Sequence, residues 1–164
     1  MRLTTRTNLA LRTLMFCAVN DRQLVRKQDV AAAVNASENH LAQVVHLLAQ
    51  TGFIVTRRGR HGGFHLARPA AGISVGTVFR AFEAGLPFIE CFSEANTCPL
   101  RPACRMGQHL ERAVEAFYAT LDPVTLADLT DCNSGLDAIL AMETARARTQ
   151  CQRMPKISVE AEPA

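Results

Sequence analysis

Tryptophan is absent from this chain of 164 residues, tyrosine occurs once, and only 5% of the residues are aromatic. The sequence also lacks any run of about 18 uncharged apolar residues, which excludes a membrane-spanning helix. Its first residues, MRLTTRTNLALR, mix charged with apolar side chains and do not have the layout of a signal peptide. We therefore expect a cytoplasmic protein with no membrane partner.

Alanine and leucine are abundant, and 48% of the residues are hydrophobic. This composition favours helices and suffices for the hydrophobic core of one ordinary domain. The charges are divided unevenly along the chain. Residues 1–80 carry 11 Lys and Arg against 3 Asp and Glu, a net charge of +8, whereas residues 81–164 carry 7 against 12, a net charge of −5. The basic half indicates a surface for a polyanion.

The first 50 residues predict three helices. The first runs from Thr4 or Thr5 to about Val19, and the second from about Arg26 to Val34. After a tight turn at Asn35 and Ala36, Ser37 caps a third helix that reaches about Gln50. That helix carries an apolar stripe of Leu41, Val44, Val45 and Leu48. Two helices joined by a short turn are typical of a helix-turn-helix.

A hairpin is predicted directly after these helices. Two short strands, Phe53–Thr56 and Phe64–Ala67, flank a turn of sequence RRGRHGG. A Gly-rich and Arg-rich hairpin behind a recognition helix is what a winged helix requires. We therefore predict a mainly α fold with a small β-hairpin wing, namely a winged helix-turn-helix followed by a long dimerisation helix.

This order of elements predicts binding to double-stranded promoter DNA. A helix fits the major groove, where small polar side chains meet base edges, and arginines on a wing hold phosphates or enter the minor groove. The expected DNA-binding residues are Ser37, Asn39, His40, Gln43 and His46 on the third helix, and Arg57, Arg58 and Arg60 on the wing. The competing interpretation is a loop whose arginines only face solvent.

The second half of the chain predicts further helices around a loop. A helix over Ser74–Ala84 completes a DNA-binding domain of residues 1–84, and residues 85–105 form a cysteine-bearing loop. A long amphipathic helix over Met106–Leu121 is followed by a short one over Pro123–Leu129, within a segment that spans residues 106–142. The apolar seam of the long helix consists of Leu110, Val114, Phe117 and Leu121. That seam suits contact between two subunits, although packing within one chain is the alternative.

Residues 143–164 turn to Arg, Thr, Gln, Pro and Glu, a composition that predicts a flexible tail.

Three of the six cysteines gather in the loop, as Cys91, Cys98 and Cys104. Their intervals of six and five residues are wider than the short spacings of zinc sites and differ from ferredoxin motifs. Wider spacing lets three thiolates converge on an iron–sulfur cluster, either [4Fe-4S] or [2Fe-2S]. A labile disulfide sensor and inert buried thiols remain as alternatives. Cys17, Cys132 and Cys151 lie apart, and no role is assigned to them.

Four stretches together resemble the Rrf-type iron–sulfur winged-helix regulators, the family that contains IscR, NsrR and RirA. They are MRLTTRTNLALR, NHLAQVVHLLAQTGF, RRGRHGGFHLARP and ECFSEANTCPLRPACRM, and the resemblance is greatest to the NsrR-like members. It implies a homodimer with one cluster per subunit, held by the thiolates of Cys91, Cys98 and Cys104. In NsrR-like members the cluster-loaded form binds DNA, and nitric oxide destroys the cluster and releases the repressor.

One position departs from the NsrR-like pattern. Those members offer an Asp in the first helix as a fourth ligand, donated across the dimer, and the matching residue here is Asn8. A neutral carboxamide is a poorer iron ligand than a carboxylate, so either Asn8 coordinates weakly or water or a small thiol takes the open site. RirA-like iron regulators can also carry Asn there. IscR-like members instead use a His at the position of Gly107, and His109 is poorly placed to replace it. Asn8 can equally be a polar residue on an exposed helix face.

The sequence thus predicts a dimeric repressor whose operator binding is controlled by an iron–sulfur cluster and responds to nitric oxide. The first alternative is a regulator that senses iron or cluster supply. The second is a metal-binding interaction module without an operator. An enzyme is not expected, because the cysteines have no activating His or carboxylate at a suitable spacing, and no phosphate-binding Gly motif opens a helix.

Overall fold

The computed structural model describes residues 4–21, 23–60, 62–83, 97–100 and 102–143. Most of the predicted cysteine loop, including Cys91, lies outside these residues, as do Cys151 and the predicted tail beyond residue 143. No helix in the described ranges is both long and apolar enough to cross a membrane.

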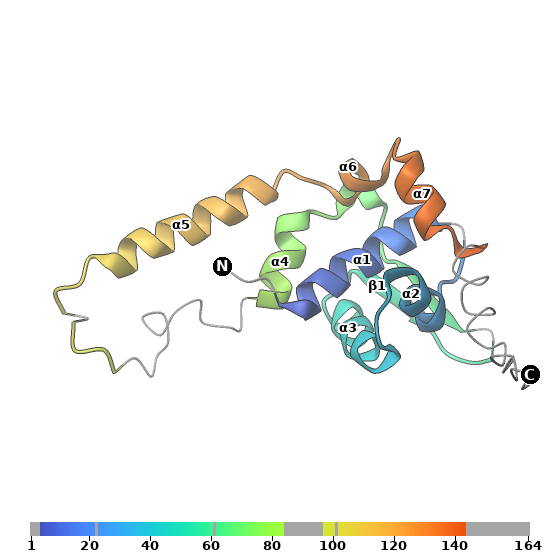
Figure 1. Ribbon diagram of the computed structural model, residues 1–164, viewed down its shortest axis with the longest axis horizontal. Coiled ribbons are helices and arrows are strands. Elements are labelled where there is room, and N and C mark those ends of the chain that lie inside the picture. Colours follow the sequence, from blue (N-terminus) through green and yellow to red (C-terminus); the bar gives the residue numbers. More distant parts are fainter. Residues whose placement is uncertain (1–3, 22, 61, 84–96, 101, 144–164) are drawn as a thin grey trace, which may run out of the picture.

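The three N-terminal helices form where the sequence predicts them (Figure 1). Helix α1 spans Thr5–Val19, α2 spans Lys27–Val34 and α3 spans Glu38–Gln50. The chain turns between α2 and α3 because Asn35 adopts the left-handed conformation, with φ of 52°, which ends α2 at its C-cap. The Ser37 side chain then accepts a hydrogen bond from the His40 amide at 3.2 Å and begins α3.

The predicted wing is an antiparallel hairpin of β1 (Ile54–Arg57) and β2 (Gly63–Leu66), in which Ile54 pairs with Leu66 and Arg57 with Gly63. Both strands lie one residue closer to the turn than predicted, so that Arg57 ends β1 instead of opening the loop. Val25 adds a bridge to the hairpin through two 2.9 Å hydrogen bonds with Phe64. A Cβ on Gly63 would lie 2.6 Å from the Val25 carbonyl oxygen, so this close approach requires glycine.

The second half consists of a 3₁₀ turn, η1 (Ala70–Gly72), and four helices: α4 (Val75–Glu83), α5 (Met106–Leu121), α6 (Leu126–Thr130) and α7 (Ser134–Leu140). Helix α5 has the predicted bounds. Helix α6 begins three residues later than predicted, because Thr125 and Asp128 form a capping box that fixes its start. Helix α7 was not predicted from the sequence.

Helix α1 lies at the centre of the core and packs against α3, α4 and α6. Its buried residues include Leu14 and Phe16, which belong to one hydrophobic cluster with Leu41 of α3 and Phe53 before the wing. The cluster extends to Leu126, Leu140 and Met142, so that α6 and α7 share the core of the winged helix.

The Asn20 side chain fastens the end of α7 to the end of α1. Its amide nitrogen donates to the carbonyl oxygens of Phe16 and Leu140 at 2.8 and 3.0 Å, and its oxygen accepts from the Met142 amide at 3.0 Å. This buried carboxamide explains why a segment far away in the sequence returns to the N-terminal core.

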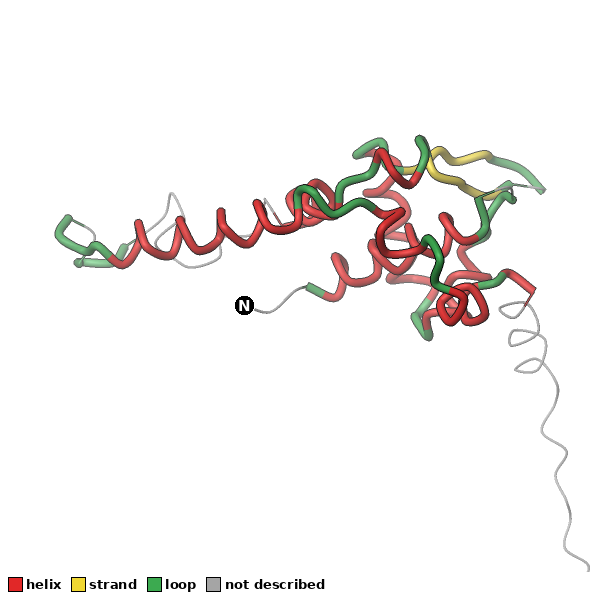
Figure 2. The backbone as a smooth tube through the Cα atoms, turned by 90° about the horizontal axis from the view of Figure 1, so that it is seen from above, coloured by secondary structure: helices red, strands yellow, loops and turns green. Residues whose placement is uncertain are grey.

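Helix α5 projects away from this core. Figures 1 and 2 show it extending to one side of the molecule, with the described part of the cysteine loop at its outer end. In the described residues, α5 packs mainly on α4 and has no buried residue.

Candidate nucleic-acid interface and cysteine loop

The polar face of α3 is open to solvent. The five predicted base-contacting residues are all exposed: Ser37, Asn39, His40, Gln43 and His46. The opposite face is held in the core by Leu41, Val44 and Leu48, whereas Val45, predicted as part of the same stripe, is only partly buried. The buried face therefore fixes α3 against α1, and the polar face remains available for a ligand.

Basic side chains outside the predicted set also surround α3. Arg6 of α1 donates a hydrogen bond to the Gln43 side-chain oxygen at 3.5 Å. Lys27, at the start of α2, pairs with Glu38 at 3.5 Å across the turn between the two helices. No motif in the sequence pointed to Arg6 or Lys27. The only sequence feature that includes them is the excess of basic residues in positions 1–80.

The three predicted wing arginines, Arg57, Arg58 and Arg60, are exposed. Glycines shape the tip between them: Gly59 has φ of 111°, and the Gly62 amide donates to the Gly59 carbonyl at 2.9 Å. Behind the tip, the Arg68 guanidinium lies over the Phe53 ring at 5.4 Å from its centroid. The wing thus presents an exposed cationic edge on a packed base.

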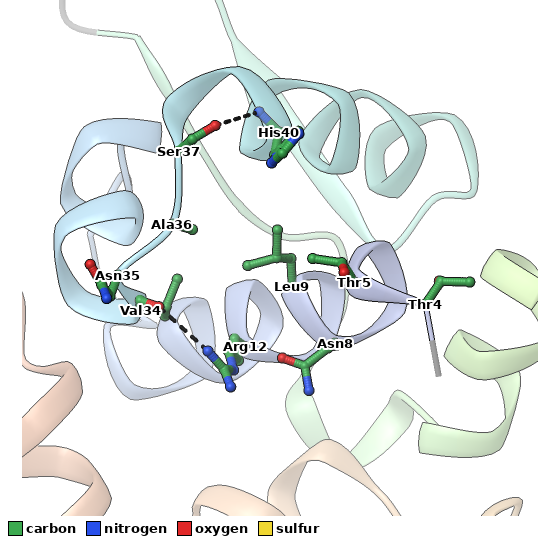
Figure 3. A pocket seen from close by; sticks show the side chains of 10 residues that line it. All are labelled: Thr4, Thr5, Asn8, Leu9, Arg12, Val34, Asn35, Ala36, Ser37 and His40. Carbon is green, nitrogen blue, oxygen red and sulfur yellow. Dashed lines mark hydrogen bonds between the residues drawn. The ribbon is translucent and has the colours of Figure 1, made fainter. Parts of the chain in front are cut away.

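Asn8 lies on the exposed face of α1, in a cleft of about 470 Å³ between the start of α1 and the turn that leads into α3 (Figure 3). Arg12, one turn further along α1, donates to the Val34 carbonyl oxygen at 3.4 Å. Ser37 and His40 line the opposite wall. The position predicted as the fourth ligand is therefore adjacent to the first residues of the predicted DNA-reading helix.

Two of the three loop cysteines can be described. Cys98 is half-buried and Cys104 is exposed. A short turn positions Cys104, because its amide and that of Ala103 donate to the Leu100 carbonyl oxygen at 2.8 and 3.0 Å. Within the described ranges, no three His, Cys, Asp or Glu side chains gather as a metal site.

The other cysteines differ from these two in their surroundings. Cys17 is buried in α1, and burial raises the pKa of its thiol to about 12. Cys132 is exposed and has φ of 56° in the turn between α6 and α7. Neither residue lies in the loop, so neither extends the predicted ligand set.

The apolar seam of α5 is only half covered. Leu110, Val114, Phe117 and Leu121 are all intermediate in exposure, while Leu100 and Met106 at the outer end are 67% and 61% exposed. An uncovered stripe of this kind on a projecting helix is typical of a surface that packs against a partner.

The comparisons with known proteins agree with this architecture. Residues 3–132 match the Rrf2 family model, which is described as an iron-dependent transcriptional regulator. The chain is 42% identical to the HTH-type transcriptional regulator NsrR of Geobacillus kaustophilus, over 85% of this chain and 97% of that protein. It is 36% identical to protein aau3 of Rhizobium meliloti, over 87% of this chain and 94% of that protein.

Solved structures show the same fold. An IscR structure from T. potens superimposes with a TM-score of 0.60 at 26% identity, covering 79% of this chain and 85% of the other. The oxidised form of CymR from Staphylococcus aureus gives a TM-score of 0.60 at 28% identity, covering 80% of this chain and 97% of the other. The exposed polar face of α3, the wing and these matches together show that the chain belongs to the Rrf2 family. It is an NsrR-like, DNA-binding transcriptional regulator rather than an enzyme.

Proposed function

We propose that this regulator is a homodimeric repressor in the cytoplasm, whose binding to promoter DNA is controlled by an iron–sulfur cluster and reversed by nitric oxide. Asn39, His40 and Gln43 read base edges in the major groove, with Ser37 and His46 beside them. Arg57, Arg58 and Arg60 hold the phosphate backbone or enter the minor groove. The exposure of all eight side chains on α3 and the wing supports these roles.

The dimer is proposed to form through α5. Its seam of apolar residues is only half covered in a single chain, and burying the exposed part against a second copy would remove that surface from water. A two-fold dimer also matches the symmetry of paired operator half-sites.

One observation carries the cluster proposal. Cys98 and Cys104 come just before the outer end of α5, the helix whose apolar face is only half covered. Thiolates are the donors that iron–sulfur clusters prefer, and a loop is adaptable enough to converge three of them. Cys91, Cys98 and Cys104 would hold the cluster, whose iron sites supply the chemistry that reacts with nitric oxide.

Asn8 is the proposed fourth ligand. Its position in the fold indicates which of the two subunits would supply this ligand to a given cluster. In both Figure 1 and Figure 2 the described loop residues lie at the outer end of α5, away from α1. A ligand from α1 would therefore come from the partner subunit. Because the carboxamide is neutral, it holds iron weakly and leaves a position accessible to a small ligand.

Binding of anaerobically purified, cluster-loaded protein to its own promoter region tests the proposal. We expect binding to disappear when a few equivalents of nitric oxide per cluster are added. Cys98→Ser should lose both the cluster absorption and the promoter binding, whereas Cys132→Ser, which removes an exposed cysteine outside the loop, should keep both. Loss of the cluster without any change in promoter affinity would contradict cluster control.

A second candidate signal is iron supply, and the neutral Asn8 is the observation that favours it. In that case promoter binding would persist in nitric oxide and vanish only with an iron chelator. Asn8→Asp would then be the informative variant, because a carboxylate restores the pattern of the NsrR-like members.

A further inference from the structure

Helix α5 is anchored at one end. The side-chain contacts that join it to the rest of the described structure gather in its last two turns. Phe117 packs edge-on against Phe79 of α4, with ring centroids 5.6 Å apart. None of these contacts involves residues 106–114, the part of the helix that projects beyond the core (Figure 1).

Arg80 of α4 is the main polar anchor. Its guanidinium lies 3.1 Å from Glu115 and 2.9 Å from Asp122, and it stacks on the Tyr118 ring at 4.4 Å from the centroid. Because the planar guanidinium fork bonds two carboxylates and stacks on one ring, it fixes the direction of α5 relative to α4 as well as the distance between the two helices. The hydrogen bonds that Arg80 donates to Glu115 and then to Asp122 raise the pKa of Arg80 above its ordinary value, so this anchor stays charged.

The backbone at the end of α5 closes tightly on the start of α4. The Ser74 hydroxyl donates to the Asp122 carbonyl oxygen at 2.8 Å, and the Val75 amide donates to that of Val124 at 2.8 Å. A Cβ on Gly76 would lie 2.7 Å from the Asp122 nitrogen. The joint therefore has little room for an alternative arrangement.

Small rotations at this joint have large effects at the far end of α5. A helix of 16 residues is about 24 Å long, so a rotation of about 10° moves its outer end by about 4 Å. That displacement is similar to the rise of one base pair in DNA, about 3.4 Å. A rotation of that size at the joint would therefore change the distance between a subunit's dimer face and its DNA-reading face by roughly one base pair.

The same helix α4 also holds the start of α1. Glu83, one turn after Arg80, accepts hydrogen bonds from the Thr4 amide at 3.1 Å, the Thr4 hydroxyl at 2.8 Å and the Thr7 hydroxyl. Helix α1 in turn packs against α3. A rigid path therefore runs from the anchored end of α5 through α4 and α1 to the predicted recognition helix.

We propose that Arg80, with Glu115 and Asp122, is a positioning residue that determines which spacing of operator half-sites the protein accepts. The inference rests on the proposed homodimer. Arg80 touches no DNA in this role; it orients α5, and α5 orients the second subunit. Removing the fork leaves the Phe117 contact and the hydrogen bonds to the Asp122 and Val124 carbonyls, which hold the last residues of α5 but not the direction of its outer end.

The experiment begins with selection of an operator from a random-sequence duplex pool by the full-length, cluster-loaded protein. Its two half-sites are then moved together or apart in single-base-pair steps through half a helical turn. The wild type should bind one spacing and lose affinity steeply on either side. Arg80→Gln should lose about tenfold at the best spacing and show a flattened profile across the series. Arg80→Lys, which keeps the charge without the fork, should lie between them.

Arg112→Gln is the matched control, because it removes the same charge from an exposed position on α5. Dimerisation measured by sedimentation, and base preference within each half-site, should be unchanged in Arg80→Gln. A spacing profile for Arg80→Gln that parallels the wild type would overturn the inference. A wild type that binds a single half-site as tightly as a pair would instead overturn the proposed dimeric function.

Discussion

Helices α3 and α5 have the same kind of amphipathic pattern, but their apolar faces are buried to different extents in the fold. Three of the four residues in the apolar stripe of α3, Leu41, Val44 and Leu48, are completely buried against α1 and its neighbours. The seam of α5 is half-exposed, and α5 has no buried residue. A periodic apolar stripe therefore shows that a helix face needs covering, while only the packing shows whether the same chain covers it.

The comparison also separates the two expected interfaces. On α3 the polar side is the candidate binding surface and the apolar side holds the helix in place. On α5 the apolar side is the candidate binding surface, and polar contacts through Arg80 hold the helix in place. Substitutions on the apolar face of α3 should consequently lower the stability of the fold, whereas substitutions on the apolar face of α5 should weaken binding to the partner.

The largest expected effect is on the buried stripe. Leu41→Ala should lower the free energy of unfolding by about 3 kcal/mol, because it removes a fully buried side chain and leaves a cavity. Urea denaturation followed by circular dichroism measures this loss, and we expect it at every protein concentration. A loss below about 1 kcal/mol would mean that the α1–α3 contact is less well packed than the structure shows.

Val114→Asp is expected to dissociate the dimer while leaving each subunit folded. A charge in a buried interface is costly, and operator affinity should fall about a hundredfold, or roughly 3 kcal/mol. Sedimentation velocity and a DNA-binding assay measure the two effects. Ala116→Asp is the control, because it places the same charge on the exposed opposite side of α5 and should leave the dimer intact.

Substitutions on the DNA-reading surface should be milder, at about 1–2 kcal/mol each, and should differ in kind. Gln43→Ala is expected to relax the base preference at one position of each half-site. Arg58→Ala should weaken binding about equally on all sequences and reduce its salt dependence. Competition against operator variants at two salt concentrations distinguishes the two patterns. Equal losses on every sequence for Gln43→Ala would contradict its base-reading role.

The smallest effect is expected at the cap of α6, which joins the core on which both helices depend. Thr125→Ala should cost about 1 kcal/mol of stability, since it removes the capping box with Asp128. Hydrogen bonds from the Thr125 backbone and hydroxyl lower the pKa of Asp128. Its contribution is therefore present above the ordinary pKa of an aspartate, near 3.9, and is lost as pH falls through the lowered value. The difference in thermal unfolding between wild type and variant should thus become smaller in strong acid, where the bond from the Asp128 amide to the Thr125 hydroxyl is the part that remains.

The local features of the fold were largely predictable from the sequence. Thr4 and Ser37 begin helices because their side chains satisfy free amides, and Asn35 ends one because it tolerates the left-handed conformation. The wing followed from its glycines and short strands, with an error of one residue. Helix α5 was placed within its exact bounds because its periodic pattern is long and bounded by turns.

The missed features depend on contacts between distant segments. Helix α7 is short, and its position depends on Leu140 and Met142 reaching the core and on the hydrogen bonds of Asn20. Arg6 and Lys27 join the surroundings of α3 only through tertiary packing. For the same reason, no spacing rule could place Asn8 in a cleft beside Ser37 and His40.

By itself, the sequence determined the winged helix-turn-helix, the polar face of α3, the cationic wing and the apolar seam of α5. These features depend on periodicity, caps and turn residues, which act within a few positions of the chain. The tertiary structure alone decided that the stripe of α3 is covered by its own chain, that the seam of α5 is left half-exposed, and that Arg80 anchors α5 at one end. Those outcomes depend on which surfaces meet after the chain folds, and local patterns contain no information about that.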